Sequence, residues 1–238
     1  MAAHFHSQED AASALHHITR DFPELAVETE SIDLSNEDWV QSVKDSYQPM
    51  QVANGVWVVP DWCQPPNPQA TNIMLYPGLA FGTGDHATTQ LCLEQLMNTG
   101  LQGKSLIDYG TGSGILAIGA LLLGAKKAVG VDADPVAVRA AIQNAELNGV
   151  EDKFTVLGCG HSGDDDDPLA EGGLQPRRFD ICVANILKGP LLELCERFAG
   201  YVKPGGTVIV SGILKEQVLD CTHVRMLPIG RACWQCNI

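Results

Sequence analysis

A glycine-rich segment at residues 105–124, SLIDYGTGSGILAIGALLLG, has the residue types that hold a nucleotide-like ligand. An apolar run passes through Asp108, and Gly110, Gly112 and Gly114 precede a second apolar run. Such a strand, turn and helix can offer backbone N–H groups and the positive end of a helix to a ligand. The glycines could instead serve only a tight bend, because glycine tolerates positive φ. The turn alone leaves both interpretations open.

A carboxylate at the end of the next predicted strand favours the binding interpretation. Asp132 lies 22 positions after Gly110, where an acid can accept hydrogen bonds from both hydroxyls of a ribose. Helix capping is the alternative role for Asp132, but Asp134 is better placed for it, directly before Pro135.

The motif also limits the kind of ligand. A dinucleotide fingerprint requires glycine at the position of Ile115, and no Walker lysine follows the turn. Asp108, Asp132 and the formal net charge of -14 favour a cation-bearing ligand such as an adenosyl sulfonium over a polyphosphate. A nicotinamide oxidoreductase is therefore the weakest alternative.

Short apolar strands alternate with amphipathic helices from Lys104 onward. The strands are predicted at Ser105–Tyr109, Ala128–Asp132, Phe154–Leu157, Phe179–Ala184 and Thr207–Ser211. Glycine stop signals follow the helices, at Gly124 after Ile115–Leu123 and at Gly149 after the helix that begins at Pro135. This order predicts an α/β fold with a doubly wound, mainly parallel sheet and right-handed crossovers.

The chain before this sheet is expected to form smaller elements. Helical spacing at Glu9–Thr19 and alternation at Leu25–Ile32 predict a partial α+β segment within residues 1–47. Residues 48–77 are rich in proline and are interpreted as a linker with a docking strand at Val56–Val59. The main domain is then expected at residues 78–238.

The composition limits the kinds of partner that the protein can bind and the compartments in which it is expected. The negative charge disfavours direct binding of nucleic acid or an anionic membrane and favours a basic protein partner. No apolar run approaches the roughly 20 residues of a membrane span, and no targeting segment is readable in MAAHFHSQED. Cys233 and Cys236 form one CxxC, but no second pair has zinc-like spacing. We expect a soluble intracellular protein, cytoplasmic or organellar, without a metal site.

Four motifs occur in order: PGLAFGTGDHATT, DYGTGSGILAIGALLLGAKKAVGVDADP, VANILKGPL and PGGTVIVSGIL. Together they resemble the bacterial ribosomal protein L-eleven methyltransferase family, over about Trp39 to Gln217. The resemblance implies the class I S-adenosylmethionine-dependent methyltransferase fold, S-adenosylmethionine as cofactor, and methylation of lysine or N-terminal amines of ribosomal protein L-eleven.

The resemblance also implies roles for residues of the loop FGTGDHATT. Its match to the family's FGTGTHPTT places the cofactor-contacting threonine at Thr89, with Phe81, Thr83 and Gly84 along the same loop. Without the resemblance, Thr89 would be interpreted as a threonine at the start of a helix over Thr88–Met97. His86 is expected to shape the loop and is assigned no catalytic role, because a loop histidine more often serves structure.

In the later motifs, the resemblance implies cofactor binding by Gly110, supported by Gly112, and ribose binding by Asp132. Asn185 of VANIL would lie beside the departing methyl group, although an asparagine there could also cap the next turn. Asp108 is expected to favour the cationic cofactor from the strand before the turn. No residue is assigned an acid–base role.

Two departures from the family pattern leave other functions open. Glu9–Trp39 resembles only the second half of the family's N-terminal domain, and the chain after Gln217 lacks its closing strands, so a chain shortened at both ends is expected. One alternative is a lysine methyltransferase for a non-ribosomal protein, and another is a non-catalytic S-adenosylmethionine-binding module. The first is distinguished by which protein in an extract gains methyl groups, and the second by binding without transfer.

Overall fold

The structure is a computed structural model that describes His17, Arg20 and residues 47–76, 82, 84, 86–160, 167–171, 178–213 and 230–234. The chain divides into two compact units, Met1–Val43 and Lys44–Ile238. Within the first unit, His17 and Arg20 have helical backbone. The rest of the helix predicted at Glu9–Thr19 and the strand predicted at Leu25–Ile32 lie outside the described residues.

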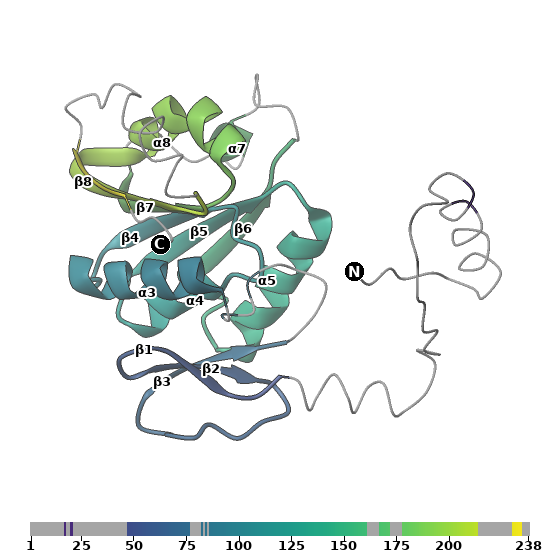
Figure 1. Cartoon of the computed structure of the whole chain (residues 1–238). Coiled ribbons are helices and arrows are strands. Elements are labelled where there is room, and N and C mark those ends of the chain that lie inside the picture. Colours follow the sequence, from purple (N-terminus) through teal and green to yellow (C-terminus); the bar gives the residue numbers. More distant parts are fainter. Residues whose placement is uncertain are drawn as a thin grey trace. The chain divides into compact units, whose positions relative to one another are not determined.

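The second unit is built around a six-stranded sheet with the order β6-β5-β4-β7-β8-β9 (Figure 1). Its strands are β4 Ser105–Tyr109, β5 Lys127–Asp132, β6 Phe154–Gly158, β7 Phe179–Asn185, β8 Val202–Ser211 and β9 Gly230–Trp234. All neighbouring pairs are parallel. The predicted α/β fold is confirmed. β8 begins five residues before the predicted strand, and β9 is a sixth strand that the sequence patterning did not predict.

Helices cover both faces of this sheet. Helices α3 Ala87–Thr99, α4 Ile115–Leu122 and α5 Pro135–Leu147 lie on one face, and α7 Lys188–Glu193 and α8 Cys195–Tyr201 on the other (Figure 1). The short helix α6 Pro168–Glu171 contributes Leu169 to the core beneath α7 and α8. Because side chains alternate along a strand, Leu106 enters the core on the α3 and α4 side while Ile107 enters the other.

A smaller sheet packs on the outer side of α3 and α4 (Figure 1). Its strands are β1 Met50–Ala53, β2 Val56–Pro60 and β3 Thr71–Leu75, with β1 antiparallel and β3 parallel to β2. Only β2 was predicted, as the docking strand. Polar residues interrupt the apolar pattern of the flanking strands, as in Thr71-Asn72 of β3. Residues 50–75 therefore form a packed sheet within the second unit, where a linker was expected.

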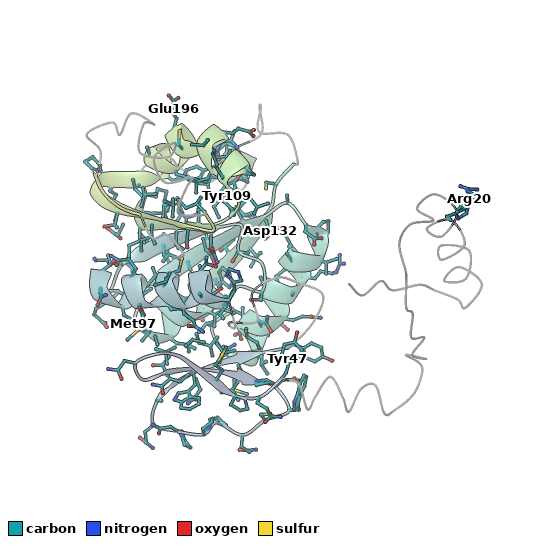
Figure 2. The ribbon with its side chains drawn as sticks, in the orientation of Figure 1. Arg20, Tyr47, Met97, Tyr109, Asp132 and Glu196 are labelled. Atoms are coloured by element: carbon teal, nitrogen blue, oxygen red, sulfur yellow. The ribbon has the colours of Figure 1, made fainter. Side chains whose placement is uncertain are left out.

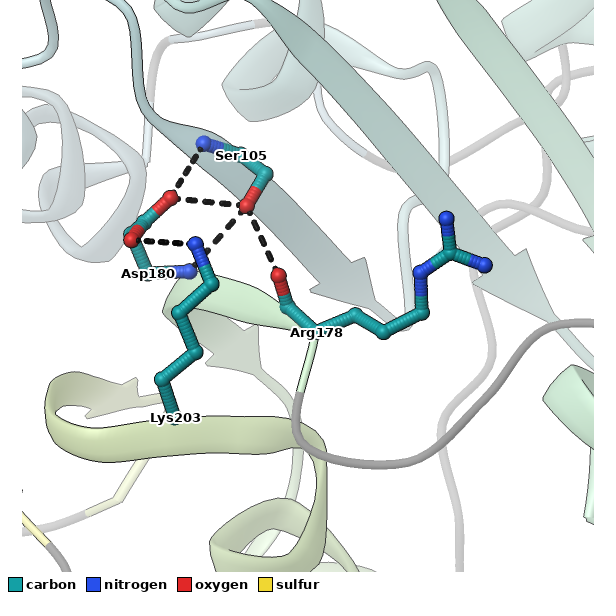
Figure 3. A network of polar contacts seen from close by, with 4 residues as sticks. All are labelled: Ser105, Arg178, Asp180 and Lys203. Atoms are coloured by element: carbon teal, nitrogen blue, oxygen red, sulfur yellow. Dashed lines mark hydrogen bonds and ion pairs between the residues drawn. The ribbon is translucent and has the colours of Figure 1, made fainter.

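The amino ends of β4 and β7 are joined by a polar network (Figure 3). Asp180 Oδ2 accepts a hydrogen bond from Ser105 N at 2.8 Å and lies 2.8 Å from the Ser105 hydroxyl. Lys203 Nζ donates to Asp180 Oδ1 at 2.7 Å. Burial raises the pKa of Asp180, but the hydrogen bonds from Lys203 and Ser105 outweigh it and lower the pKa below its ordinary value.

Removing the Asp180 carboxylate should destabilise the protein more than removing its lysine partner. Asp180→Ala leaves the nearly buried Ser105 amide without its acceptor, which costs about 1–3 kcal/mol. Lys203→Ala removes a half-exposed ion pair and should cost less than about 1 kcal/mol. Urea unfolding of both variants measures this. The contribution of Asp180 should be present above its unfolded pKa and disappear as the pH falls through its lowered folded pKa. Equal losses in the two variants would contradict the assignment.

Candidate cofactor site

The sheet topology places a ligand site at the carboxyl ends of β4 and β7. The chain passes from β4 to β5 and β6 in one direction and then continues with β7 and β8 on the other side of β4. Open α/β sheets bind ligands at such a switch point, outside the carboxyl ends of the strands. The glycine turn after β4 and Asn185 at the end of β7 both lie at this edge.

The glycine turn adopts a backbone that requires its glycines. Gly110, Gly112 and Gly114 have φ values of 75°, 55° and 83°. At Gly110 a Cβ atom would also collide with the Ile186 side chain, so residues with side chains are excluded there on two grounds. This contact holds the segment after β7 directly against the turn.

Most amides of the turn bind within the protein, contrary to the expectation that they would be free for a ligand. Gly110 N and Thr111 N both donate to the Val131 carbonyl oxygen, at 2.8 and 3.0 Å. Gly112 N donates to Asp132 Oδ2 at 2.8 Å. The turn is thereby fastened to the end of β5, since the positive-φ backbone points successive amides at that strand. The turn therefore forms a fixed wall of backbone at this edge, and most of its amides are already bonded within the protein.

Asp132 is half-buried at the carboxyl end of β5, beside the glycine turn (Figure 2). Its Oδ2 accepts from Gly112 N and its Oδ1 accepts from Asp134 N at 3.0 Å. A carboxylate offers about four lone-pair sites, so two acceptor positions have no partner among the described residues. Capping of α5 falls to Asp134, whose Oδ1 accepts from Val136 N at 2.8 Å. The predicted capping role of Asp134 is therefore confirmed, while ribose binding by Asp132 stays a prediction.

Asp108 lies beneath the turn rather than along a ligand surface. It is fully buried, and its Oδ2 accepts hydrogen bonds from the Thr111 hydroxyl at 2.8 Å and from Ala117 N at 3.3 Å. Its Oδ1 has no hydrogen-bond partner among the described residues. Burial raises the pKa of Asp108 to about 7. The amino end of α4 is thus capped by the protein's own carboxyl group, which disfavours a phosphate ligand at that end.

The start of α3 is shaped by His86, as predicted. His86 is the N-cap, and its Nδ1 accepts from Thr88 N at 3.3 Å and lies 2.6 Å from the Thr88 hydroxyl oxygen. Thr89 N donates to the His86 carbonyl oxygen at 3.0 Å, and Thr89 is 1% exposed. Any ligand contact by Thr89 therefore falls to its side chain, because its amide is already used.

The loop before α3 is described at Gly82 and Gly84, while the predicted site residues Phe81 and Thr83 lie outside the described residues. The Gly82 carbonyl oxygen accepts a hydrogen bond from the Ser113 hydroxyl at 2.6 Å. Gly84 approaches Val58 of the small sheet and Ile115 of α4. Gly82 therefore contacts the glycine turn directly.

Asn185 ends β7, half-exposed and in register with Ser211 of β8. The side chain of the next residue, Ile186, lies against Gly110, and the Ile186 backbone lies where a Cβ atom on Gly212 would be. The structure therefore brings Gly110, Gly112, Asp132 and Asn185 to one edge, with Thr89 on the helix that packs against β7 and β8.

Sequence reasoning missed three residues at this edge. Ser113 joins the turn to the loop, as described above. Asn144 is fully buried and donates from Nδ2 to the Ser113 carbonyl oxygen at 2.8 Å. Cys159 N donates to the Asp132 carbonyl oxygen at 3.0 Å, and burial first of all raises the pKa of the Cys159 thiol. For Asn144 a signal existed, because Asn148 follows it at the i,i+4 spacing of one helix face.

Comparison with known proteins shows the family to which this chain belongs. Residues 1–225 match the family described as "Ribosomal protein L11 methyltransferase (PrmA)". The chain belongs to the ribosomal protein L11 methyltransferase family. The predicted resemblance is therefore confirmed, and the match extends further toward the N-terminus than the motifs indicated.

Individual relatives of the family agree. A ribosomal protein L11 methyltransferase of Pseudomonas aeruginosa is 44% identical over 222 residues, which are 91% of this chain and 70% of that protein. One of Acinetobacter baumannii is 47% identical over 192 residues, 81% of this chain and 61% of that protein. A crystal structure of the ribosomal protein L11 methylase of Lactobacillus delbrueckii subsp. bulgaricus has a TM-score of 0.63 at 34% identity, covering 74% of this chain and 86% of that one.

Family membership makes this protein an S-adenosylmethionine-dependent methyltransferase. The residues fit the cofactor, because Asp132 keeps two acceptor positions for ribose hydroxyls and the capped α4 end leaves no phosphate subsite. Among the described residues, no group of three or more His, Cys, Asp or Glu side chains is arranged to hold a metal ion. In the same part of the chain, every helix is too short or too polar to cross a membrane.

Proposed function

We propose that this protein transfers methyl groups from S-adenosylmethionine to amines of ribosomal protein L11, on lysine side chains or the N-terminus. Family membership supports the substrate. The observation that carries the cofactor assignment is the position of Asp132, which is hydrogen-bonded to Gly112 N at the switch point and, within the described part of the chain, keeps two acceptor positions open. The net charge of -14 favours association with a basic protein substrate.

In this proposal, each site residue has a defined task. Asp132 accepts hydrogen bonds from the ribose hydroxyls, while Gly110 and Gly112 form the wall against which the methionyl portion lies. The Thr89 side chain, with Phe81 and Thr83 of the preceding loop, holds the methionine end. Asp108 acts from behind the turn, since its Oδ2 binds Thr111 and Ala117 and so fixes the backbone that the cofactor contacts.

The chemical step requires alignment more than acid–base catalysis. When bound, the cofactor supplies a methyl group already activated on a sulfonium. Asn185 orients the acceptor amine from the end of β7, where an amide oxygen can accept a hydrogen bond from the nitrogen. The amine would have to lose its proton first, and the new C–N bond would form as the bond from the methyl carbon to the sulfonium sulfur breaks, which leaves a neutral thioether. Ile186, packed against Gly110, keeps Asn185 in register with the turn and helps to exclude water.

The substrate-binding role of residues 1–47 belongs to the same proposal. This segment resembles part of the family's N-terminal domain, and we assign it to contact with ribosomal protein L11. The experiment is methyl transfer from radiolabelled S-adenosylmethionine to purified, unmethylated ribosomal protein L11, with mass spectrometry to locate the modified amines.

Transfer to lysine or N-terminal amines is the expected result. Asn185→Ala should lower kcat by about 100-fold with a cofactor Kd within about threefold of the unsubstituted protein, because it removes alignment of the amine but no ribose contact. Cofactor binding without transfer to any protein of an extract would contradict the enzyme assignment. Transfer only to another protein of that extract would contradict the substrate.

A further inference from the structure

Asn144 of α5 and Asn148, the C-cap residue of that helix, bind the outer edge of β3 as a neighbouring strand would. Asn148 Oδ1 accepts from Met74 N at 2.8 Å, and its Nδ2 donates to the Met74 carbonyl oxygen at 2.7 Å. Asn144 Oδ1 accepts from Tyr76 N at 2.8 Å. Met74 and Tyr76 are two residues apart and therefore present their backbone groups to the same edge. Both asparagines thus tie the small sheet to α5.

Of the two asparagines, Asn144 also bonds to the glycine turn, whereas Asn148 does not. Its Nδ2 donates to the Ser113 carbonyl oxygen at 2.8 Å, and the Ser113 hydroxyl donates to the Gly82 carbonyl oxygen at 2.6 Å. Asn144 is fully buried and Ser113 is 6% exposed. A buried amide that uses both its oxygen and its nitrogen fixes the distance between the groups it joins, because losing either bond leaves a buried polar group unpaired.

The two positions that Asn144 connects, Tyr76 and Gly82, both lie in the segment between β3 and α3. Tyr76 is the residue at which the chain leaves β3, and Gly82 lies within the motif that precedes α3. Asn144 holds the first directly and the second through Ser113. The turn between Gly110 and Ser113 is therefore the common anchor for both positions.

We infer that Asn144 is a positioning residue for cofactor binding, which acts through Ser113 to hold Gly82, in the segment before α3, against the glycine turn. The inference rests on the proposed cofactor role of that turn. Asn148 is its matched control, because it ties the same strand to the same helix without touching the turn.

The test compares Asn144→Ala with Asn148→Ala in the full chain. Both should lower Tm, since Asn144→Ala removes the acceptor of Tyr76 N and Asn148→Ala removes both side-chain partners of the Met74 backbone. Asn144→Ala should raise the cofactor Kd and KM about tenfold with kcat within about threefold, the size expected for one buried hydrogen bond. Asn148→Ala should leave the cofactor Kd within about twofold. Equal effects of the two variants on Kd, or no effect of Asn144→Ala, would overturn the inference.

Two further variants keep the test informative if Asn144→Ala does not fold. Asn144→Asp still accepts from Tyr76 N but presents a second acceptor to the Ser113 carbonyl, so it should weaken cofactor binding. Ser113→Ala removes only the bond to Gly82 and should raise Kd to a similar extent. The double variant should be less than additive, because both act on one connection. Additive effects would overturn the inference, whereas an unsubstituted protein that does not bind S-adenosylmethionine would contradict the proposed function itself.

Discussion

Asp132→Ala should abolish measurable binding of S-adenosylmethionine. The substitution removes the acceptor for both ribose hydroxyls and also releases Gly112 N, to which Asp132 Oδ2 bonds at 2.8 Å. Loss of two hydrogen bonds to a charged group corresponds to a rise in Kd of about 100-fold or more. Isothermal titration calorimetry measures it. Retained micromolar affinity would contradict the cofactor assignment.

Asp134→Ala is the control for this experiment. Asp134 lies two residues away, and among the described residues its carboxylate bonds to Val136 N, as the cap of α5, and not to the glycine turn. Its loss should cost about 1 kcal/mol of stability through the missing N-cap and leave the cofactor Kd unchanged. Comparable losses of affinity in both variants would indicate disruption of the β5–α5 connection rather than loss of a ribose contact.

Asp108→Asn should remove a pH dependence from the stability of the unliganded protein. Burial raises the folded-state pKa of Asp108 from 3.8 to about 7. A group with a raised folded pKa contributes stability that is fully present below its unfolded pKa and is lost as the pH rises through the folded pKa. The roughly three pH units between these pKa values correspond to about 4 kcal/mol.

The introduced amide would remain neutral at every pH, and its oxygen can still accept from Thr111 and Ala117. The variant should therefore gain roughly 4 kcal/mol relative to the unsubstituted protein between about pH 4 and pH 8, an upper value because buried sites relax. Denaturant unfolding at both pH values, in each protein, measures the gain. A stability difference that does not change with pH would contradict the buried, unpaired carboxyl oxygen as the cause.

Local sequence patterns were enough to predict most of the strands and helices around the site and the residues at their ends. The alternation of apolar strands with helices, the Asp134-Pro135 cap, the glycine stops and the acid after β5 are all readable within short windows, because each depends on neighbours along the chain. The four motifs likewise identified the family. The parallel sheet and the grouping of Gly110, Gly112 and Asp132 followed from strand ends alone.

Only the tertiary structure showed which hydrogen bonds each of these residues makes. The sequence suggested free amides at the glycine turn and an Asp108 that faces the ligand, yet those amides bond to β5 and Asp108 caps α4 from below. The spacing of the two asparagines marked a helix face, but it did not indicate that Asn144 connects Tyr76, directly after β3, with Ser113, which is 31 residues before Asn144. Such hydrogen bonds join segments that are distant in sequence, so their partners depend on how the layers pack and not on any local propensity.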